Sequence, residues 1–128
     1  MRHLAPSEAR VIHALVIEQF GGAEGQRDPA SLEAALAQPS AEYFGRLLHD
    51  TVAEQAAAYL FHICQAHAFM DGNKRTAVFC MLAFLHLNGQ QLRVSDDELF
   101  DLVLLVAKGA LQKPELAARL EPWLNKIS

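Results

Sequence analysis

An unbroken run of apolar residues near the middle of the chain gives the clearest structural signal. Residues 77–85 are all apolar, from Ala77 to Leu85. A segment that is apolar on every side is typical of a buried helix rather than a surface helix. It is too short to span a bilayer, which takes about 20 apolar residues. We therefore predict a buried central helix over residues 74–88, ended by Gly89.

Helical spacing and boundary residues predict five more helices. The expected spans are residues 7–20, 29–38, 51–66, 95–108 and 114–121. Ser7, Asp28 and Ser95 suit the N-cap position, and Pro29 directly after Asp28 is typical of a helix start. One face of the first helix carries Ile12, Leu15, Val16 and Phe20.

Two smaller features complete the predicted secondary structure. Residues 91–94 are expected to be a short extended piece, and Pro122 is expected to kink the last helix or begin a separate turn. The pattern as a whole favours an all-α fold packed around the central helix. A length of 128 residues predicts one domain, residues 1–128.

Residues 38–50 are the least regular stretch, because they contain Pro39, Gly45 and two adjacent aromatic residues, Tyr43 and Phe44. One interpretation is a connecting loop whose aromatic side chains pack on the core. The other is a flap that docks an extended segment of a target protein by strand addition. Residue type alone favours the connecting loop.

Composition narrows the class of protein. With 52% hydrophobic and 20% charged residues, the chain is globular and not disordered. The net charge of −4 gives no basic surface for nucleic acid, and we expect neither a direct nucleic-acid partner nor a membrane. Cys64 and Cys80 lie in apolar helical segments and are expected to be free thiols in a reducing cytoplasm. The spacing Cys64-x-x-His67 hints at zinc, but no second ligand pair follows.

The candidate chemistry lies in residues 67–75, immediately before the central helix. The first turn of a helix carries unpaired N–H groups and a partial positive charge, so cations are disfavoured there. Lys74 and Arg75 nevertheless occupy this position, beside a flexible Gly72. Cations, donor N–H groups and a glycine together make a good receptor for phosphate.

A simpler interpretation is that both cations are solvated surface charges and that Asp71 or Asn73 is an ordinary N-cap. The presence of His67 four residues before Asp71 favours the anion site. An unperturbed histidine has a pKa of about 6.5, so a neutral imidazole is available as a general base. One carboxylate together with phosphate oxygens suffices to hold Mg²⁺, and Asn73 can hold either the loop or a phosphate.

This cluster resembles the signature of the Fic/Doc superfamily, His-x-Phe-x-Asp/Asn-Gly/Ala-Asn-Gly/Lys-Arg. The matching residues are His67, Phe69, Asp71, Gly72, Asn73, Lys74 and Arg75. Most Fic nucleotidyl transferases carry glycine where this chain has Lys74, and lysine is similar to the Doc (death-on-curing) toxin branch. The resemblance implies a compact all-α bundle of about six helices around a buried central helix, with a flap loop.

The resemblance also implies a function. Doc proteins are toxins of type II toxin–antitoxin systems, and they use ATP and Mg²⁺ to phosphorylate a threonine of elongation factor Tu and so arrest translation. In this chain His67 would take the proton from the hydroxyl, Asp71 would bind the metal, and the phosphates would contact Gly72, Asn73, Lys74 and Arg75. Tyr43 and Phe44 would belong to a target-docking flap. A Phd-like antitoxin would be the inhibitor, because the inhibitory Ser/Thr-x-x-x-Glu-Gly/Asn pattern of many Fic proteins does not occur.

Three alternatives stay beside this interpretation. A Fic-type adenylyltransferase would move AMP to a protein hydroxyl, and a non-catalytic domain would only bind a partner. A nucleic-acid-cleaving toxin lacks a basic face and a second acidic cluster near His67. The remaining histidines show no pairing in the sequence; they are His3, His13, His49, His62 and His86.

Overall fold

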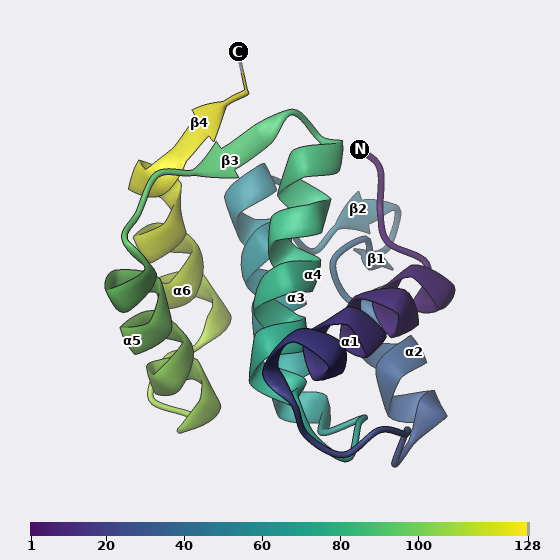
Figure 1. The fold of residues 1–128 in the computed structure, drawn as a ribbon. Helices are drawn as coiled ribbons and strands as arrows, with labels where there is room; N and C mark the ends of the chain where they lie inside the picture. The colour runs from purple at the N-terminus through teal and green to yellow at the C-terminus, as the bar shows by residue number, and fades with distance from the viewer. Residues whose placement is uncertain (128) are drawn as a thin grey trace.

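Two antiparallel helices, α3 and α4, form the centre of the computed structural model, which describes residues 1–127. Figure 1 shows α1 and α2 on one side of this pair and α5 and α6 on the other. The helices are α1 (Pro6–Phe20), α2 (Pro29–Ala37), α3 (Val52–Ala66), α4 (Asn73–Leu87), α5 (Asp96–Ala107) and α6 (Lys113–Leu120), followed by the 3₁₀ turn η1 (Glu121–Trp123). The predicted all-α bundle is therefore confirmed, with short strands added.

Side chains of α3 and α4 supply most of the core. The small residues Ala53, Ala56 and Ala57 are buried on α3, so the neighbouring backbones can approach closely. Tyr59 of α3 is also fully buried, and its hydroxyl accepts a 2.9 Å hydrogen bond from the Leu4 N–H. Because that bond satisfies a buried donor, it also fixes the segment before α1.

The prediction that α4 is buried on every side is wrong. Phe79 is 39% exposed, and Leu82 and Ala83 are only partly covered. These side chains line an apolar groove of about 650 Å³ between α1, α4 and the strand after α4. We call it the α1–α4 groove. The α1 side of the groove includes Leu15, which is 53% exposed.

Most helix boundaries follow the predicted caps. Asp28 accepts from the Ser31 N–H at the start of α2, and Ser95 accepts from the Glu98 N–H at the start of α5. Ser7 was expected to cap α1, and this is wrong, because α1 begins at Pro6 and its N-cap is Ala5. There the Glu8 carboxylate accepts a 2.9 Å hydrogen bond from the N–H of Ala5.

Within residues 1–127, four short strands form two antiparallel pairs. β3 (Gln90–Leu92) overlaps the predicted extended piece, and it pairs with β4 (Leu124–Lys126), which the sequence did not predict. The other pair, β1 (Glu42–Tyr43) and β2 (Arg46–Leu47), makes a hairpin within the stretch expected to be irregular.

The hairpin presents its aromatic side chains to solvent. Phe44 and Gly45 have φ angles of 50° and 76°, the positive values that a type I′ turn requires at both central positions. Phe44 is 89% exposed and Tyr43 is 64% exposed. Their rings contact each other at 4.4 Å between centroids, in an edge-to-face arrangement. The interpretation that these aromatic residues pack on the core is therefore wrong.

Two histidines that showed no pairing in the sequence, His49 and His62, both contact the side chain of Lys113. The ammonium of Lys113 lies 3.2 Å from Nε2 of His49 and 2.9 Å from Nε2 of His62, so it can donate to both rings. His49 follows the hairpin, His62 lies on α3 and Lys113 begins α6. Burial first, and then the Lys113 charge, lowers the pKa of His62 to about 4 and also lowers the pKa of His49.

This arrangement predicts acid sensitivity. His62 stays neutral in the fold down to about pH 4, whereas an unfolded histidine takes up a proton near pH 6.5. The free energy of unfolding should therefore fall as the pH drops from about 6.5 towards 4. Urea denaturation at pH 7, 6 and 5 would measure this slope. His62→Gln should flatten it, and His86→Gln, at an exposed site, should not; equal slopes in all three proteins would contradict the assignment.

Candidate active site

The cluster predicted from the sequence forms the loop between α3 and α4 together with the first turn of α4; we call residues 67–75 the motif loop. α3 ends at Ala66, and His67 caps it in the left-handed conformation, with φ 48° and ψ 42°. This backbone conformation is uncommon for a residue with a side chain, and here it turns the chain out of the helix. The imidazole of His67 is exposed at the end of a packed helix.

Backbone hydrogen bonds fix the motif loop to the segment before α2. The N–H groups of Arg27 and Asp28 both donate to the carbonyl of Ala68, at 2.8 and 3.1 Å. The N–H of Met70 donates to the carbonyl of Gly25 at 3.1 Å. The pattern resembles a short strand pairing, so the loop has a defined position although it lies at the surface.

Phe69 anchors the loop in the core and is 1% exposed. The ring of His13 on α1 stacks on it, with centroids 3.8 Å apart and planes 7° apart. Nε2 of His13 also donates a 2.8 Å hydrogen bond to the carbonyl of Asp71. Sequence reasoning missed His13, because it lies 58 residues from Asp71 and no local pattern joins them.

Asn73 closes the loop on itself. Its side-chain oxygen accepts from the Phe69 N–H at 3.1 Å, and its side-chain nitrogen donates to the Phe69 carbonyl at 3.0 Å. Of the two roles expected for Asn73, the structure shows the loop-holding one, and contact with a phosphate stays a prediction. Gly72 precedes it as the N-cap of α4, with φ 77°.

The carboxylate of Asp71 is oriented by the loop after α1. Its Oδ2 accepts a 2.8 Å hydrogen bond from the Ala23 N–H, whereas its Oδ1 accepts no hydrogen bond from residues 1–127. Over the same residues, no group of three or more His, Cys, Asp or Glu side chains is placed to hold a metal ion. The donor set at Asp71 therefore fits an ion that takes one protein carboxylate and completes its shell with phosphate and water oxygens, as Mg²⁺ does.

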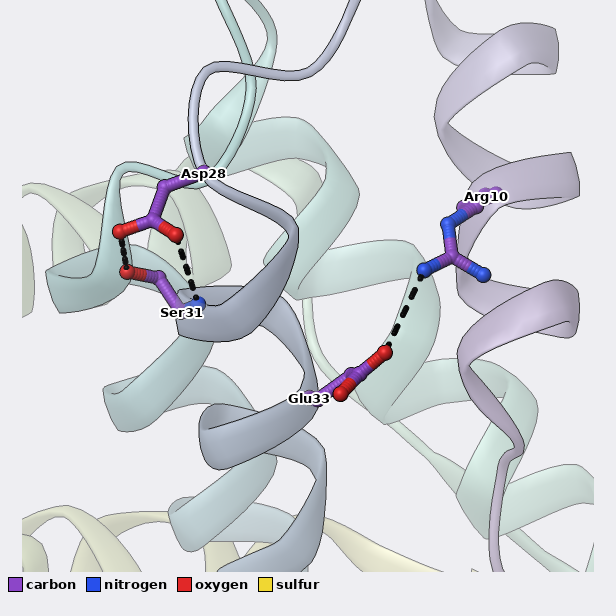
Figure 2. A network of polar contacts seen from close by, with 4 residues as sticks. All are labelled: Arg10, Asp28, Ser31 and Glu33. Carbon is purple, nitrogen blue, oxygen red and sulfur yellow. Dashed lines mark hydrogen bonds and ion pairs between the residues drawn. The ribbon is translucent and has the colours of Figure 1, made fainter.

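Lys74 and Arg75 are exposed cations in the first turn of α4. The first helical hydrogen bond of α4 runs from the Thr76 N–H to the Gly72 carbonyl at 2.9 Å, so the N–H groups of residues 73–75 precede the helical ladder. Figure 2 shows the one ion pair found among residues 1–127, Arg10 to Glu33 at 3.9 Å. The two cations therefore have no carboxylate partner within the described chain, which leaves a positive helix end open to an anion.

Other candidate groups lie outside this site. Cys64 and Cys80 are free and buried, as predicted, and burial raises the pKa of each thiol to about 12. Both thiols are therefore neutral near pH 7. Tyr43 and Phe44 lie on the β1–β2 hairpin, and their role in docking stays a prediction. Within residues 1–127, no helix combines the length and the hydropathy needed to cross a bilayer.

Comparison with known proteins identifies the family. The Fic/DOC family model matches residues 3–85, which is more than half of the chain. The chain belongs to the Fic/Doc family. One relative, "Protein kinase doc" of Escherichia phage P1, is 35% identical over 120 residues, a match that covers 94% of each chain.

A second relative of this Fic/Doc chain is "Toxin Doc" of Mycolicibacterium smegmatis (strain ATCC 700084 / mc(2)155). It is 42% identical over 78 residues, which cover 61% of this chain and 60% of the relative. Both relatives carry the name Doc, so the chain falls in the Doc branch. The lysine at position 74 predicted this branch.

The packing around Gly72 predicts that a side chain there destabilises the fold. A Cβ at this position would lie 3.2 Å from Cδ1 of Ile17 and 3.3 Å from Cγ1 of Val16. Gly109, after the end of α5, is a matched control, since its φ is 75° and a Cβ there would meet nothing within 4 Å. Both alanine variants should lose about 1–2 kcal/mol from the left-handed backbone.

Gly72→Ala should lose about 1 kcal/mol or more beyond Gly109→Ala, because Ile17 and Val16 must also move. Urea denaturation of the two variants beside the parent protein would measure the difference. Equal losses would show that contact with α1 does not constrain the loop.

Proposed function

We propose that the protein is the toxin of a type II toxin–antitoxin system and that it transfers the γ-phosphoryl group of ATP to a threonine hydroxyl of elongation factor Tu. The observation that carries the proposal is the motif loop itself, which has His67 at the end of α3, Asp71 before α4 and, in the first turn of α4, two cations without a carboxylate partner among residues 1–127. A relative named a protein kinase and another named a toxin support it. Action on a translation factor would place the protein in the cytoplasm.

In the proposed reaction His67 accepts the proton of the target hydroxyl. The hydroxyl oxygen then forms a bond to the γ-phosphorus, and the bond from that phosphorus to the bridging oxygen breaks, with ADP as the leaving group. Phosphoryl transfer asks mainly for positioning and for stabilisation of charge on the phosphate oxygens. Lys74 would supply a single positive charge, and Arg75 would donate two parallel hydrogen bonds in a bidentate contact. The backbone N–H groups of residues 73–75 would donate further hydrogen bonds.

Asp71 is the residue that would hold Mg²⁺ beside the phosphates. When bound, the ion would neutralise negative charge on the phosphate oxygens. The hydrogen bond from Ala23 and the contact between His13 and the Asp71 carbonyl orient this residue from two sides.

A Phd-like antitoxin is the partner expected to restrain this activity. The side chains of His67, Asp71, Lys74 and Arg75 are exposed, and the inhibitory Ser/Thr-x-x-x-Glu-Gly/Asn pattern does not occur in the sequence, so restraint by a second chain is consistent with the fold. The α1–α4 groove, about 650 Å³ with a mostly apolar lining, is suited to the apolar face of a short helix. Its exposed Leu15 and Phe79 would be covered in such a complex.

Intact-mass spectrometry tests the reaction. The protein is incubated with bacterial translation factors, Mg²⁺ and ATP, with His67→Ala as the inactive variant and His86→Ala as a matched control, an exposed histidine on α4. A gain of roughly 80 Da on elongation factor Tu is expected, since one phosphoryl group is transferred. His67→Ala should slow the gain by about 10²- to 10⁴-fold, and His86→Ala should not.

Two other outcomes would change the assignment. A gain of roughly 329 Da, one AMP group, would move the protein to Fic-type adenylyl transfer. The variant Lys74→Gly tests whether this lysine decides between phosphoryl transfer and AMP transfer. If the variant phosphorylated the target as the parent protein does, Lys74 would not decide between the two reactions. No mass change on any factor would argue against the stated target and favour a domain that binds without reacting.

We further propose that the β1–β2 hairpin docks the target protein. Phe44→Ala should raise the KM for the protein substrate about tenfold, because a well-placed aromatic contact contributes more than 1 kcal/mol to an interface. The KM for ATP should stay unchanged. Val11→Ala is the control, since Val11 is also an exposed apolar side chain, at 60%, and lies on α1 outside the hairpin. An unchanged protein KM in Phe44→Ala would remove the hairpin from target recognition.

A further inference from the structure

His49 is the buried residue at the root of the β1–β2 hairpin. Residues 42–48 and Asp50 are all exposed, whereas His49 is 7% exposed. A two-stranded hairpin is at best marginally stable by itself in water, so contacts at its root decide where it lies. The N–H of Leu48 donates to the carbonyl of Ala41 at 2.9 Å and closes the root. The position of the hairpin on the bundle therefore depends on the next residue, His49.

Apolar packing does little to hold this root. A cavity of about 330 Å³ lies beside it, lined by Leu48, His49, Glu54, Lys113 and Pro114. Leu48 is 52% exposed although it lines the cavity. Because apolar contacts leave this side open, the polar contacts of His49 are the main attachment of the root.

The backbone of His49 is attached to α3 and its ring to α6. Its carbonyl accepts a 3.0 Å hydrogen bond from Nε2 of Gln55, a side chain of α3 that is 1% exposed. Oε1 of Gln55 lies 2.7 Å from Nε2 of His3, which can donate to it. The ammonium of Lys113 lies 3.2 Å from Nε2 of His49 and 2.9 Å from Nε2 of His62. Lys113 therefore connects the root of the hairpin to a second point on α3.

Lys113 lies where a cation is unfavourable. It is the first residue of α6, and this end of a helix carries a partial positive charge. The side chain is partly buried and forms no ion pair with a carboxylate of residues 1–127. Burial first, and then the Lys113 charge, lowers the pKa of both His49 and His62, so both rings are neutral near pH 7 and can accept from the ammonium. A local conflict of this kind is typical of a residue that has a functional role.

We propose that Lys113 is a positioning residue for target recognition, which holds the root of the β1–β2 hairpin in a fixed place on α3. The proposal rests on the proposed function, in which the hairpin docks the target protein and His67 accepts the proton of its hydroxyl. α3 belongs to both sites, since its His62 contacts Lys113 and His67 caps its C-terminal end. A hairpin that is already in place before the target arrives lowers the cost of binding.

α3 separates the hairpin from the candidate base. The hairpin precedes the first residue of α3 and His67 follows the last, and its 15 residues are about 22 Å long. In Figure 1, β1 and β2 lie apart from the loop that joins α3 to α4. A target protein would thus contact the chain at two separate places. A shift of the hairpin root on α3 would therefore move the reacting hydroxyl away from His67.

NMR relaxation on the full chain tests the positioning without any substrate. In the parent protein, the backbone amides of residues 42–48 should have order parameters close to those of α3, about 0.85. Lys113→Met removes the ammonium and keeps the apolar stem, so the order parameters of the hairpin should fall towards about 0.6. Those of β3 and β4 should stay unchanged. A hairpin that is equally mobile in the parent and the variant would overturn the proposal.

Initial rates with the protein target give the second measurement. Lys113→Met should raise the KM for the protein target about tenfold, because a hydrogen bond from a charged donor is lost and binding must then order the hairpin. The KM for ATP should stay unchanged. Lys113→Arg keeps a cation with several donors and should have a KM close to that of the parent. Lys108→Met is the matched control, since it removes an exposed cation at the end of α5 and should change neither KM.

His49→Phe is an independent variant, because it keeps a buried ring and removes the acceptor nitrogen. It should match Lys113→Met in both measurements. If Phe44→Ala raised the KM for the protein target and neither of these variants did, Lys113 would have no role in positioning, and docking by the hairpin would stand. An equal rise in the KM for ATP would also overturn the proposal, since the damage would then extend to the phosphate site. If the parent phosphorylated no translation factor, the proposed function would fail, and the order parameters would still decide whether Lys113 holds the hairpin.

Discussion

Burial of Phe69 under the ring of His13 fixes the position of every other group in the motif loop. The stacked pair holds the middle of the loop against α1. The hydrogen bond from His13 to the Asp71 carbonyl holds a second point of the loop, two residues further along, against the same helix. Asn73 then holds both backbone groups of Phe69, which sets the start of α4 relative to the buried ring. The exposed, polar groups of the site thus depend on one apolar contact in the core.

This anchoring explains how unfavourable local features can persist together. The motif loop contains two left-handed residues, His67 and Gly72, and two cations at the positive end of a helix. The left-handed backbone of His67 and the two cations each cost free energy when taken alone, whereas glycine adopts the conformation of Gly72 readily. The bonds from segment 25–28 and the packing of α3 against α4 hold the loop regardless. Such local conflict with an otherwise consistent fold is expected at a functional site and not in a purely structural turn.

The sequence predicted features that depend on neighbouring residues and missed those that depend on distant ones. Asp28, Thr51 and Ser95 start helices through hydrogen bonds to groups three residues ahead, so a short window contains all the information. The motif loop is similarly local. The strand β4 and the link from Lys113 to His62 join residues far apart in the chain, and no periodicity marks such partners.

The run 77–85 shows a different limit of the pattern. Its residues are apolar all round, but periodicity cannot say which face another helix will cover.

The partly uncovered face of α4 borders both the α1–α4 groove and a smaller, mainly apolar pocket of about 300 Å³ beside Lys74 and Arg75. Phe20 and Phe79, whose rings are stacked, line both of them. Arg75 lies against the same Phe20 ring. A polypeptide bound in the α1–α4 groove would therefore contact the ring on which Arg75 packs. Under the proposed function, the groove suited to the antitoxin and a cation expected to bind a phosphate thus share the side chain of Phe20.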